Sequence, residues 1–183
     1  GLNCFADKEQ VEESIRRHHF GYTDALDTRY KHIHVQTHKA AHLAHMNDII
    51  GPMTNPLHPR AMTHKILGVN HLVDPITVAQ AYNILNEKGI THVEHAFFVR
   101  GFVDERQEGG IDEVSIFQGG TSVAELNNGD IVTYEMHAED FGLSRREYVE
   151  PQKEKAAFSY NIIEGNEQGT LTDLVLANAA LVQ

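Results

Sequence analysis

Gly110-Ile-Asp-Glu-Val-Ser115 is the stretch around which this chain of 183 residues is organised. It places two adjacent carboxylates, Asp112 and Glu113, between glycines and short apolar runs, on a loop that leads into a strand. Adjacent carboxylates repel each other and are awkward to bury, so an apolar loop that carries them usually supplies a cation or water. Oxygen ligands on a loop favour a hard ion such as Mg²⁺. A solvated acidic turn is the alternative interpretation of the pair alone.

Further motifs follow in a fixed order along the chain. They are a strand-like Gly120-Thr-Ser-Val-Ala-Glu-Leu126, a hairpin turn at Asn127-Asn-Gly-Asp130, and the loop Ala138-Glu-Asp-Phe-Gly-Leu143, with Ile50-Gly-Pro-Met-Thr-Asn-Pro56 upstream and Val175-Leu-Ala-Asn-Ala179 near the end. Together with the acidic stretch, these strings resemble the carboxy-terminal half of the anthranilate phosphoribosyltransferase family. The resemblance covers nearly the whole chain.

The resemblance implies an α/β fold of the nucleoside phosphorylase and phosphoribosyltransferase type. We expect part of a mostly parallel central sheet flanked by helices, with a β-hairpin in the carboxy-terminal half. Residues 1–183 then form the carboxy-terminal portion of the catalytic domain. Family members also have an amino-terminal helical domain and a glycine-rich donor loop. Neither is found in these residues, so we expect the chain to be inactive alone, as a fragment or as one part of a larger assembly.

The resemblance also implies a reaction. Family members transfer a phosphoribosyl group from phosphoribosyl pyrophosphate to anthranilate in tryptophan biosynthesis, and a related aromatic acceptor is possible here. In this reading Asp112 and Glu113 hold the cofactor Mg²⁺ against the leaving pyrophosphate, and Ser115 could add a hydrogen bond. A cytoplasmic homodimer is expected for the full-length protein. The alternative is a divergent paralogue that keeps the fold but binds another ligand as a non-catalytic or regulatory protein.

Composition excludes some other classes of protein. The net charge of −11 argues against binding to nucleic acid, which favours a basic surface. No apolar run reaches the length that spans a membrane, so no membrane partner is expected. The single cysteine, Cys4, rules out an internal disulfide and fits a reducing cytoplasm. Small-molecule substrates are the partners that remain.

A histidine-rich helix is predicted over Tyr30 to Met46. Its spacing puts four imidazoles, those of His34, His38, His42 and His45, on one face. Imidazoles four residues apart can chelate zinc, but a site also needs a third ligand, and none has matching spacing. We therefore expect a polar helix face and not a purpose-built metal site.

Strand, helix and strand are predicted in succession between His64 and Val99. The first strand, His64 to Val69, reads as buried; Asp74 then caps a helix that Gly89 ends, and Val93 to Val99 forms the second strand. This order predicts a parallel crossover unit, and ligands in such sheets gather at the carboxyl ends of the strands. The acidic pair lies just past such an end.

Three more helices are predicted from their caps and apolar spacing. Asp7 and Gln10 form a capping box for a helix that ends near His18. A second runs from Lys153 to Ile163. Thr170, with Asp173 three residues later, opens a final helix that runs apolar to the end of the sequence. Its apolar character implies either burial against the sheet or a continuation that is missing from these residues.

Two positions are assigned to the substrates from the resemblance alone. Asn55 lies in the turn string that the family places near the acceptor pocket. His38 falls about where the family has an arginine that contacts the carboxylate of the aromatic acceptor. An imidazole cannot supply the bidentate guanidinium fork and is often neutral at pH 7.

Replacing His38 by Arg should therefore strengthen anthranilate binding in the full-length protein. The missing charged hydrogen bonds correspond to ~1.5–3 kcal/mol, which is roughly tenfold to hundredfold in affinity. Calorimetric titration of anthranilate at pH 8 into wild type and His38→Arg measures the effect, with binding of phosphoribosyl pyrophosphate as the control. Ordinary anthranilate kinetics at pH 8 that His38→Ala leaves unchanged would refute the assignment.

Overall fold

A computed structural model describes residues 7–22, 35–36, 39, 59–149 and 155–181. The chain divides into two compact units, residues 1–63 with 85–93, and residues 64–84 with 94–183. The elements, in chain order, are α1 (Lys8–His18), η2 (Pro59–Ala61), β1 (His64–Gly68), α4 (Pro75–Glu87), β2 (His95–Phe102), β3 (Gly110–Ile111), β4 (Thr121–Asn127), β5 (Asp130–Met136), η3 (Ala138–Phe141), α5 (Lys155–Ile163) and α6 (Thr170–Ala180). No helix in these ranges is both long and apolar enough to cross a membrane.

The first unit contains α1, whose ends follow the sequence. The Asp7 side chain accepts a hydrogen bond from the Gln10 N–H at 2.8 Å, and the Gln10 side chain accepts one from the Asp7 N–H at 3.1 Å. This is the predicted capping box. The helix ends where His19 adopts a left-handed conformation with φ of 55°. The predicted start and end of this helix are confirmed.

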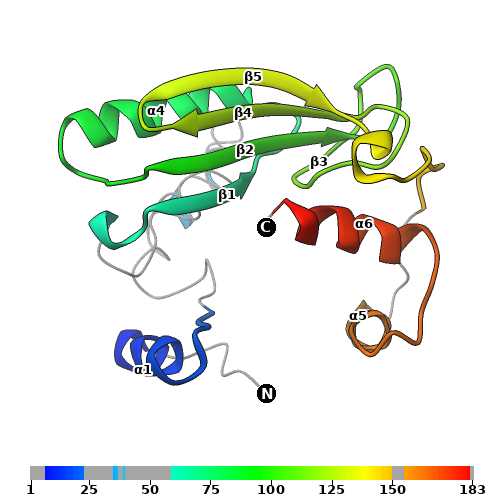
Figure 1. The fold of residues 1–183 in the computed structure, drawn as a ribbon, viewed down its shortest axis with the longest axis horizontal. Coiled ribbons are helices and arrows are strands. Elements are labelled where there is room, and N and C mark those ends of the chain that lie inside the picture. Colours follow the sequence, from blue (N-terminus) through cyan, green and yellow to red (C-terminus); the bar gives the residue numbers. More distant parts are fainter. Residues whose placement is uncertain (1–6, 23–34, 37–38, 40–58, 150–154, 182–183) are drawn as a thin grey trace. The chain divides into compact units, whose positions relative to one another are not determined.

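The second unit is built on one sheet with the strand order β1-β2-β4-β5, in which β3 also pairs with β2 (Figure 1). The predicted α/β class is confirmed. The predicted strand–helix–strand unit is also present, because β1 and β2 are parallel and α4 connects them. The pairings β2–β3, β2–β4 and β4–β5 are antiparallel, so the described part of the sheet is mixed and not mostly parallel.

Hairpin turns account for this departure from a parallel sheet. The predicted turn between β4 and β5 is confirmed: Asn128 and Gly129 have φ of 48° and 95°, which a two-residue hairpin turn of this kind requires. The connection from β2 to β3 folds back in the same way, with Phe102 opposite Gly110. Strands joined by such short connections can pair only antiparallel.

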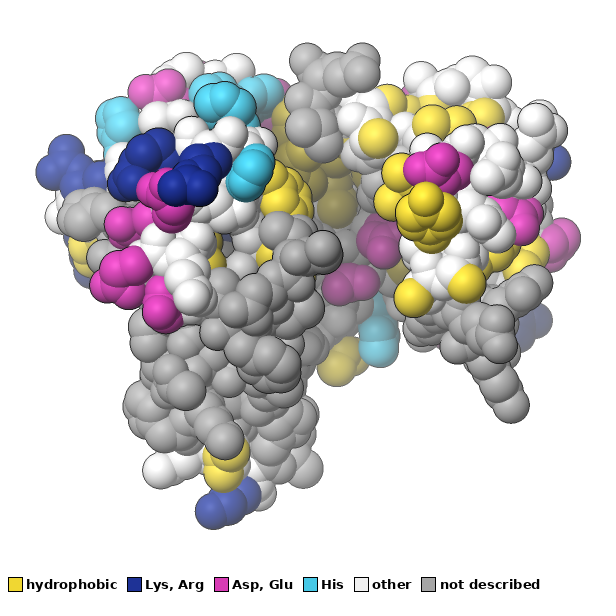
Figure 2. Space-filling view, turned by 90° about the horizontal axis from the view of Figure 1, so that it is seen from below, with side chains coloured by type: hydrophobic (Ala, Val, Ile, Leu, Met, Phe, Trp, Pro, Cys, Tyr) yellow, Lys and Arg dark blue, Asp and Glu magenta, His cyan; other side chains and the backbone are white. Residues whose placement is uncertain are grey.

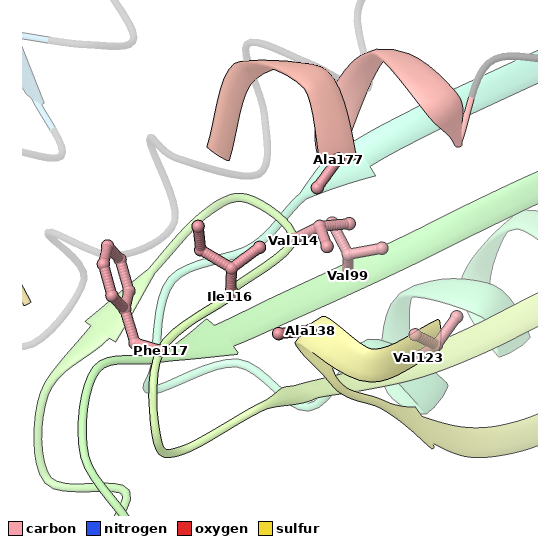
Figure 3. Close-up of a cluster of buried hydrophobic side chains, with 7 residues drawn as sticks. All are labelled: Val99, Val114, Ile116, Phe117, Val123, Ala138 and Ala177. Carbon is pink, nitrogen blue, oxygen red and sulfur yellow. The ribbon is translucent and has the colours of Figure 1, made fainter. Parts of the chain in front are cut away.

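Helices cover both faces of the sheet. On one face Tyr82 of α4 stacks on Phe98 of β2, with ring centroids 5.4 Å apart. Val99 points to the opposite face, because successive residues of a strand alternate. There it joins a buried cluster that includes Ala177 of α6, which points toward Val114 and Val99 in Figure 3; the other members are Ile116, Phe117, Val123 and Ala138. The apolar contacts on the two faces of the sheet form the core of the second unit.

Two predictions about burial and capping are wrong. Strand β1 is not buried throughout, since Ile66 is 40% exposed. Helix α6 begins after Gly169, which has no side chain to cap it, and Asp173 pairs with Arg146 at 2.9 Å. The final helix packs against the sheet through Ala177, as expected, but only part of its apolar surface is buried. Its Leu176 is 58% exposed, and apolar side chains are visible on the side of the molecule where α5 and α6 lie (Figure 2).

Replacing Tyr82 by Phe should raise the free energy of unfolding by about 1 kcal/mol. The Tyr82 hydroxyl is buried with no hydrogen-bond partner among the described residues, and such a group costs about 1–3 kcal/mol. Tyr134→Phe is the matched control. Its hydroxyl donates to Glu125 Oε2 at 3.1 Å, so this change should lower the free energy by about 1 kcal/mol. Urea denaturation of both variants measures the difference, and a loss of equal size in both would contradict it.

Candidate functional site

The acidic pair lies across the carboxyl ends of β1 and β2. A Cβ atom on Gly68, the last residue of β1, would lie 1.6 Å from the carbonyl oxygen of Asp112. A Cβ on Gly101, near the end of β2, would lie 2.3 Å from the carbonyl oxygen of Glu113. Any side chain at either position would displace the loop. These two glycines therefore let the backbone of the pair rest directly on the sheet.

The two side chains of the pair are exposed, although their backbone packs closely on the sheet. Partial desolvation raises the pKa of Glu113, and the neighbouring charge of Asp112 raises it further. A bound cation would relieve the repulsion that Glu113 experiences from the neighbouring charge. The donor set therefore fits a hard divalent ion.

Among the described residues, protein side chains alone do not form a complete metal site. The described residues contain no group of three or more His, Cys, Asp or Glu side chains that could hold a metal. Mg²⁺ typically takes only one or two carboxylates from a protein and completes its octahedron with water and substrate phosphate. The pair supplies that number of ligands.

Ser115 has a structural role instead of a free hydroxyl. Its side chain donates to the Phe102 carbonyl at 2.6 Å and accepts from the Phe117 N–H at 3.1 Å. Its own N–H donates to Thr121 Oγ1 at 2.7 Å, and the residue is fully buried. The hydrogen bond that the sequence suggested Ser115 could offer to a ligand is therefore used to attach the loop to β2 and β4.

Val114, the residue after the pair, is hydrogen-bonded to α6. The Val114 N–H donates to Asn178 Oδ1 at 2.8 Å, and Asn178 Nδ2 donates to the Val114 carbonyl at 3.0 Å. These residues are 64 positions apart. Sequence reasoning missed this contact. The Val175–Ala179 motif was the available signal, because an asparagine among small apolar residues needs a partner when it is partly buried.

The loop from 103 to 109 closes a compact hairpin beside the pair. The Val103 N–H donates to the Gly109 carbonyl at 3.1 Å, and the Gln107 N–H donates to the Asp104 carbonyl at 3.1 Å. A Cβ on Gly119 would lie 2.3 Å from the same Asp104 oxygen, so the loop packs closely on the turn before β4. It is an ordered extension of the sheet.

A second concave feature lies on the α4 face of the sheet. It is an open pocket of about 440 Å³ at the start of α4, where Asp74, Arg100, Ser122 and Glu135 contribute to the lining. It contains charges of both signs and does not include the acidic pair. The two features are therefore separate.

The acceptor side of the predicted site falls outside the described residues. His38 and Asn55 are both in this part of the chain, as is nearly all of the histidine-rich segment Tyr30 to Met46. Their assignments stay predictions.

Comparison with known proteins gives a consistent result. The sequence model described as "Glycosyl transferase family, a/b domain" matches residues 1–183. Proteins named anthranilate phosphoribosyltransferase match 98% of this chain: one from Symbiobacterium thermophilum at 34% identity, one from Neisseria gonorrhoeae at 30%, and one from Anaeromyxobacter dehalogenans at 33%. The matches cover 49%, 49% and 50% of those proteins. The chain therefore spans about half the length of these relatives.

Replacing Glu113 by Gln should stabilise the metal-free fold at pH 7. The folded state raises the pKa of Glu113, so it holds this proton more tightly than the unfolded state does. Stability is therefore lost as pH rises through the interval above the ordinary carboxyl pKa. The gain in Glu113→Gln should be less than about 1 kcal/mol, as for other exposed charges, and should vanish near pH 4. Melting curves at both pH values, with Glu164→Gln as an exposed control, measure it; destabilisation at pH 7 would contradict the account.

Proposed function

Because this chain belongs to the glycosyl transferase family whose a/b domain matches it from end to end, we propose that it supplies the metal and pyrophosphate site of a phosphoribosyltransferase. The donor is phosphoribosyl pyrophosphate, and the acceptor is anthranilate or a related aromatic amine, in line with the names of the relatives. The observation that carries the proposal is the backbone of Asp112 and Glu113 resting on Gly68 and Gly101.

The reaction sets clear demands on the protein. The bond between the anomeric carbon of the sugar and the pyrophosphate oxygen breaks, and a bond from that carbon to the acceptor nitrogen forms with loss of a proton. Positive charge grows on the sugar ring while negative charge grows on the leaving group. The protein gains most by neutralising the leaving group and by holding the two reactants in line. A covalent nucleophile is not required.

The acidic pair meets the first of these demands. Mg²⁺, when bound, neutralises and orients the departing pyrophosphate. Asp112 and Glu113 would hold it, each through an exposed carboxylate on a backbone that packs directly on the sheet. Their location past the ends of two parallel strands also agrees with where ligands bind in α/β sheets.

Neighbouring residues support the pair without contacting the reactants. Ser115 attaches the end of the loop to β2 through the Phe102 carbonyl. Arg146 donates to the Ile116 carbonyl through its N–H at 3.0 Å and pairs with Asp173 of α6. These bonds restrict the backbone of the segment that follows the pair.

Binding of Mg²⁺ by the full-length protein should be strong only when phosphoribosyl pyrophosphate is present, because two carboxylates leave most of the coordination shell to water and phosphate. Calorimetric titration of Mg²⁺ with and without the donor measures this. Asp112→Ala/Glu113→Ala should lose at least tenfold in affinity in the presence of donor.

Glu164→Gln, an exposed carboxylate on the turn after α5, is the control and should bind like wild type. Equal Mg²⁺ binding by wild type and the double variant would refute the assignment. Donor-dependent Mg²⁺ binding without transfer to any aromatic acceptor would instead favour a non-catalytic member of the family.

A further inference from the structure

We propose that Asn178 of α6 is a positioning residue for the acidic pair, and that it sets the direction in which Glu113 presents its carboxylate to a divalent cation. The proposal rests on the proposed function, because it assigns a role in the same metal site. Asn178 does not touch the reactants in this account. It acts through the backbone of Val114.

The peptide group between Glu113 and Val114 is held at both of its ends. Its carbonyl, that of Glu113, faces the position where Gly101 lacks a side chain. Its N–H, that of Val114, donates to Asn178 Oδ1 at 2.8 Å. A peptide group is planar, so close packing at the carbonyl and a hydrogen bond at the N–H together restrict the orientation of the plane. The Cα atom of Glu113 lies in that plane, so the orientation of the plane influences the direction of the Glu113 side chain.

Asn178 uses both of its amide donors in this arrangement, and its amide oxygen accepts a third hydrogen bond. Besides accepting from Val114, its Nδ2 donates to the Val114 carbonyl at 3.0 Å and to the Leu174 carbonyl, one turn earlier in α6, at 2.9 Å. An asparagine amide has two N–H donors, and both are occupied. The bond to Leu174 restrains the side chain on its own helix. The amide is therefore a rigid connection between α6 and the loop.

Packing next to Asn178 keeps this connection short. Ala177 is 2% exposed and Val114 is fully buried, in the same apolar cluster (Figure 3). The small side chain of Ala177 lets α6 approach the loop closely. At its other end α6 is tied to Arg146 through Asp173 at 2.9 Å. The helix is thus held at two points, and one of them is the residue that follows the pair.

Such a residue matters because metal binding tolerates little misplacement of its ligands. Groups that orient the ligands of a metal typically change its affinity by 10–100-fold when they are removed. A residue that only stabilised the fold would lower the melting temperature and leave the affinity for the cation unchanged. The two roles can therefore be separated by measurement.

The test uses Mn²⁺ as a spectroscopic substitute for Mg²⁺. Asn178→Leu keeps the branched shape of the side chain but removes all three hydrogen bonds. Val123→Ala is the matched control, since it removes buried atoms from the same cluster and leaves the three hydrogen bonds of Asn178 in place. Free Mn²⁺ is measured by electron paramagnetic resonance in titrations of the full-length protein with phosphoribosyl pyrophosphate present, and melting temperatures are recorded in parallel.

We expect both variants to melt at a lower temperature than wild type, while only Asn178→Leu weakens Mn²⁺ binding, by about 10–100-fold. Asn178→Ala, in which water can fill the space, should show the same loss and provides the measurement if Asn178→Leu does not fold. Wild-type affinity in either Asn178 variant would overturn the inference. If wild type itself shows no donor-dependent Mn²⁺ binding, the proposed function fails, and the inference fails with it.

Discussion

The contact between the backbone of Asp112–Glu113 and the two glycines at the strand ends is the constraint on which the rest of this site depends. Gly68 and Gly101 come from neighbouring parallel strands, and each leaves room for one carbonyl oxygen of the pair. The sheet thus provides a flat support for the loop. Asn178 holds the loop from the α6 side through two hydrogen bonds to the backbone of Val114. An exposed acidic dipeptide is in this way given a fixed backbone.

A fixed backbone makes the repulsion between the two carboxylates useful. On a flexible loop, adjacent charges would turn apart into water at little cost. Here the loop cannot move toward the sheet, and partial desolvation and the Asp112 charge together raise the pKa of Glu113. A divalent cation that binds both carboxylates relieves this unfavourable interaction. Relief of the repulsion between the two carboxylates therefore contributes to the free energy of cation binding.

Helix caps and hairpin turns depend on neighbouring residues, and several of these were predicted correctly from the sequence. The capping box of Asp7, the Asp74 cap before Pro75 and the Asn128-Gly129 turn act over a few residues, and each has the predicted location. The adjacency and loop location of the acidic pair were equally local. The family was identified from ordered motifs, and the match over residues 1–183 confirms it.

Features that depend on distant contacts could not be predicted in the same way. Thr170 and Asp173 have the spacing of a cap, but Asp173 pairs instead with Arg146, which lies 27 residues away in the sequence. Strand β2 starts two residues later than predicted, at His95, where its register with β1 and β4 begins. The roles of Gly68, Gly101 and Asn178 depend on which segments meet in space, and no periodicity encodes that.

The most direct measurement of the central claim is a crystal structure of the full-length protein grown with Mn²⁺ and phosphoribosyl pyrophosphate. An anomalous difference map locates the metal without assumption. The account predicts a peak about 2.1 Å from carboxylate oxygens of Asp112 and Glu113, with pyrophosphate oxygens completing the shell. A metal bound to the donor elsewhere, with both carboxylates facing only solvent, would contradict it.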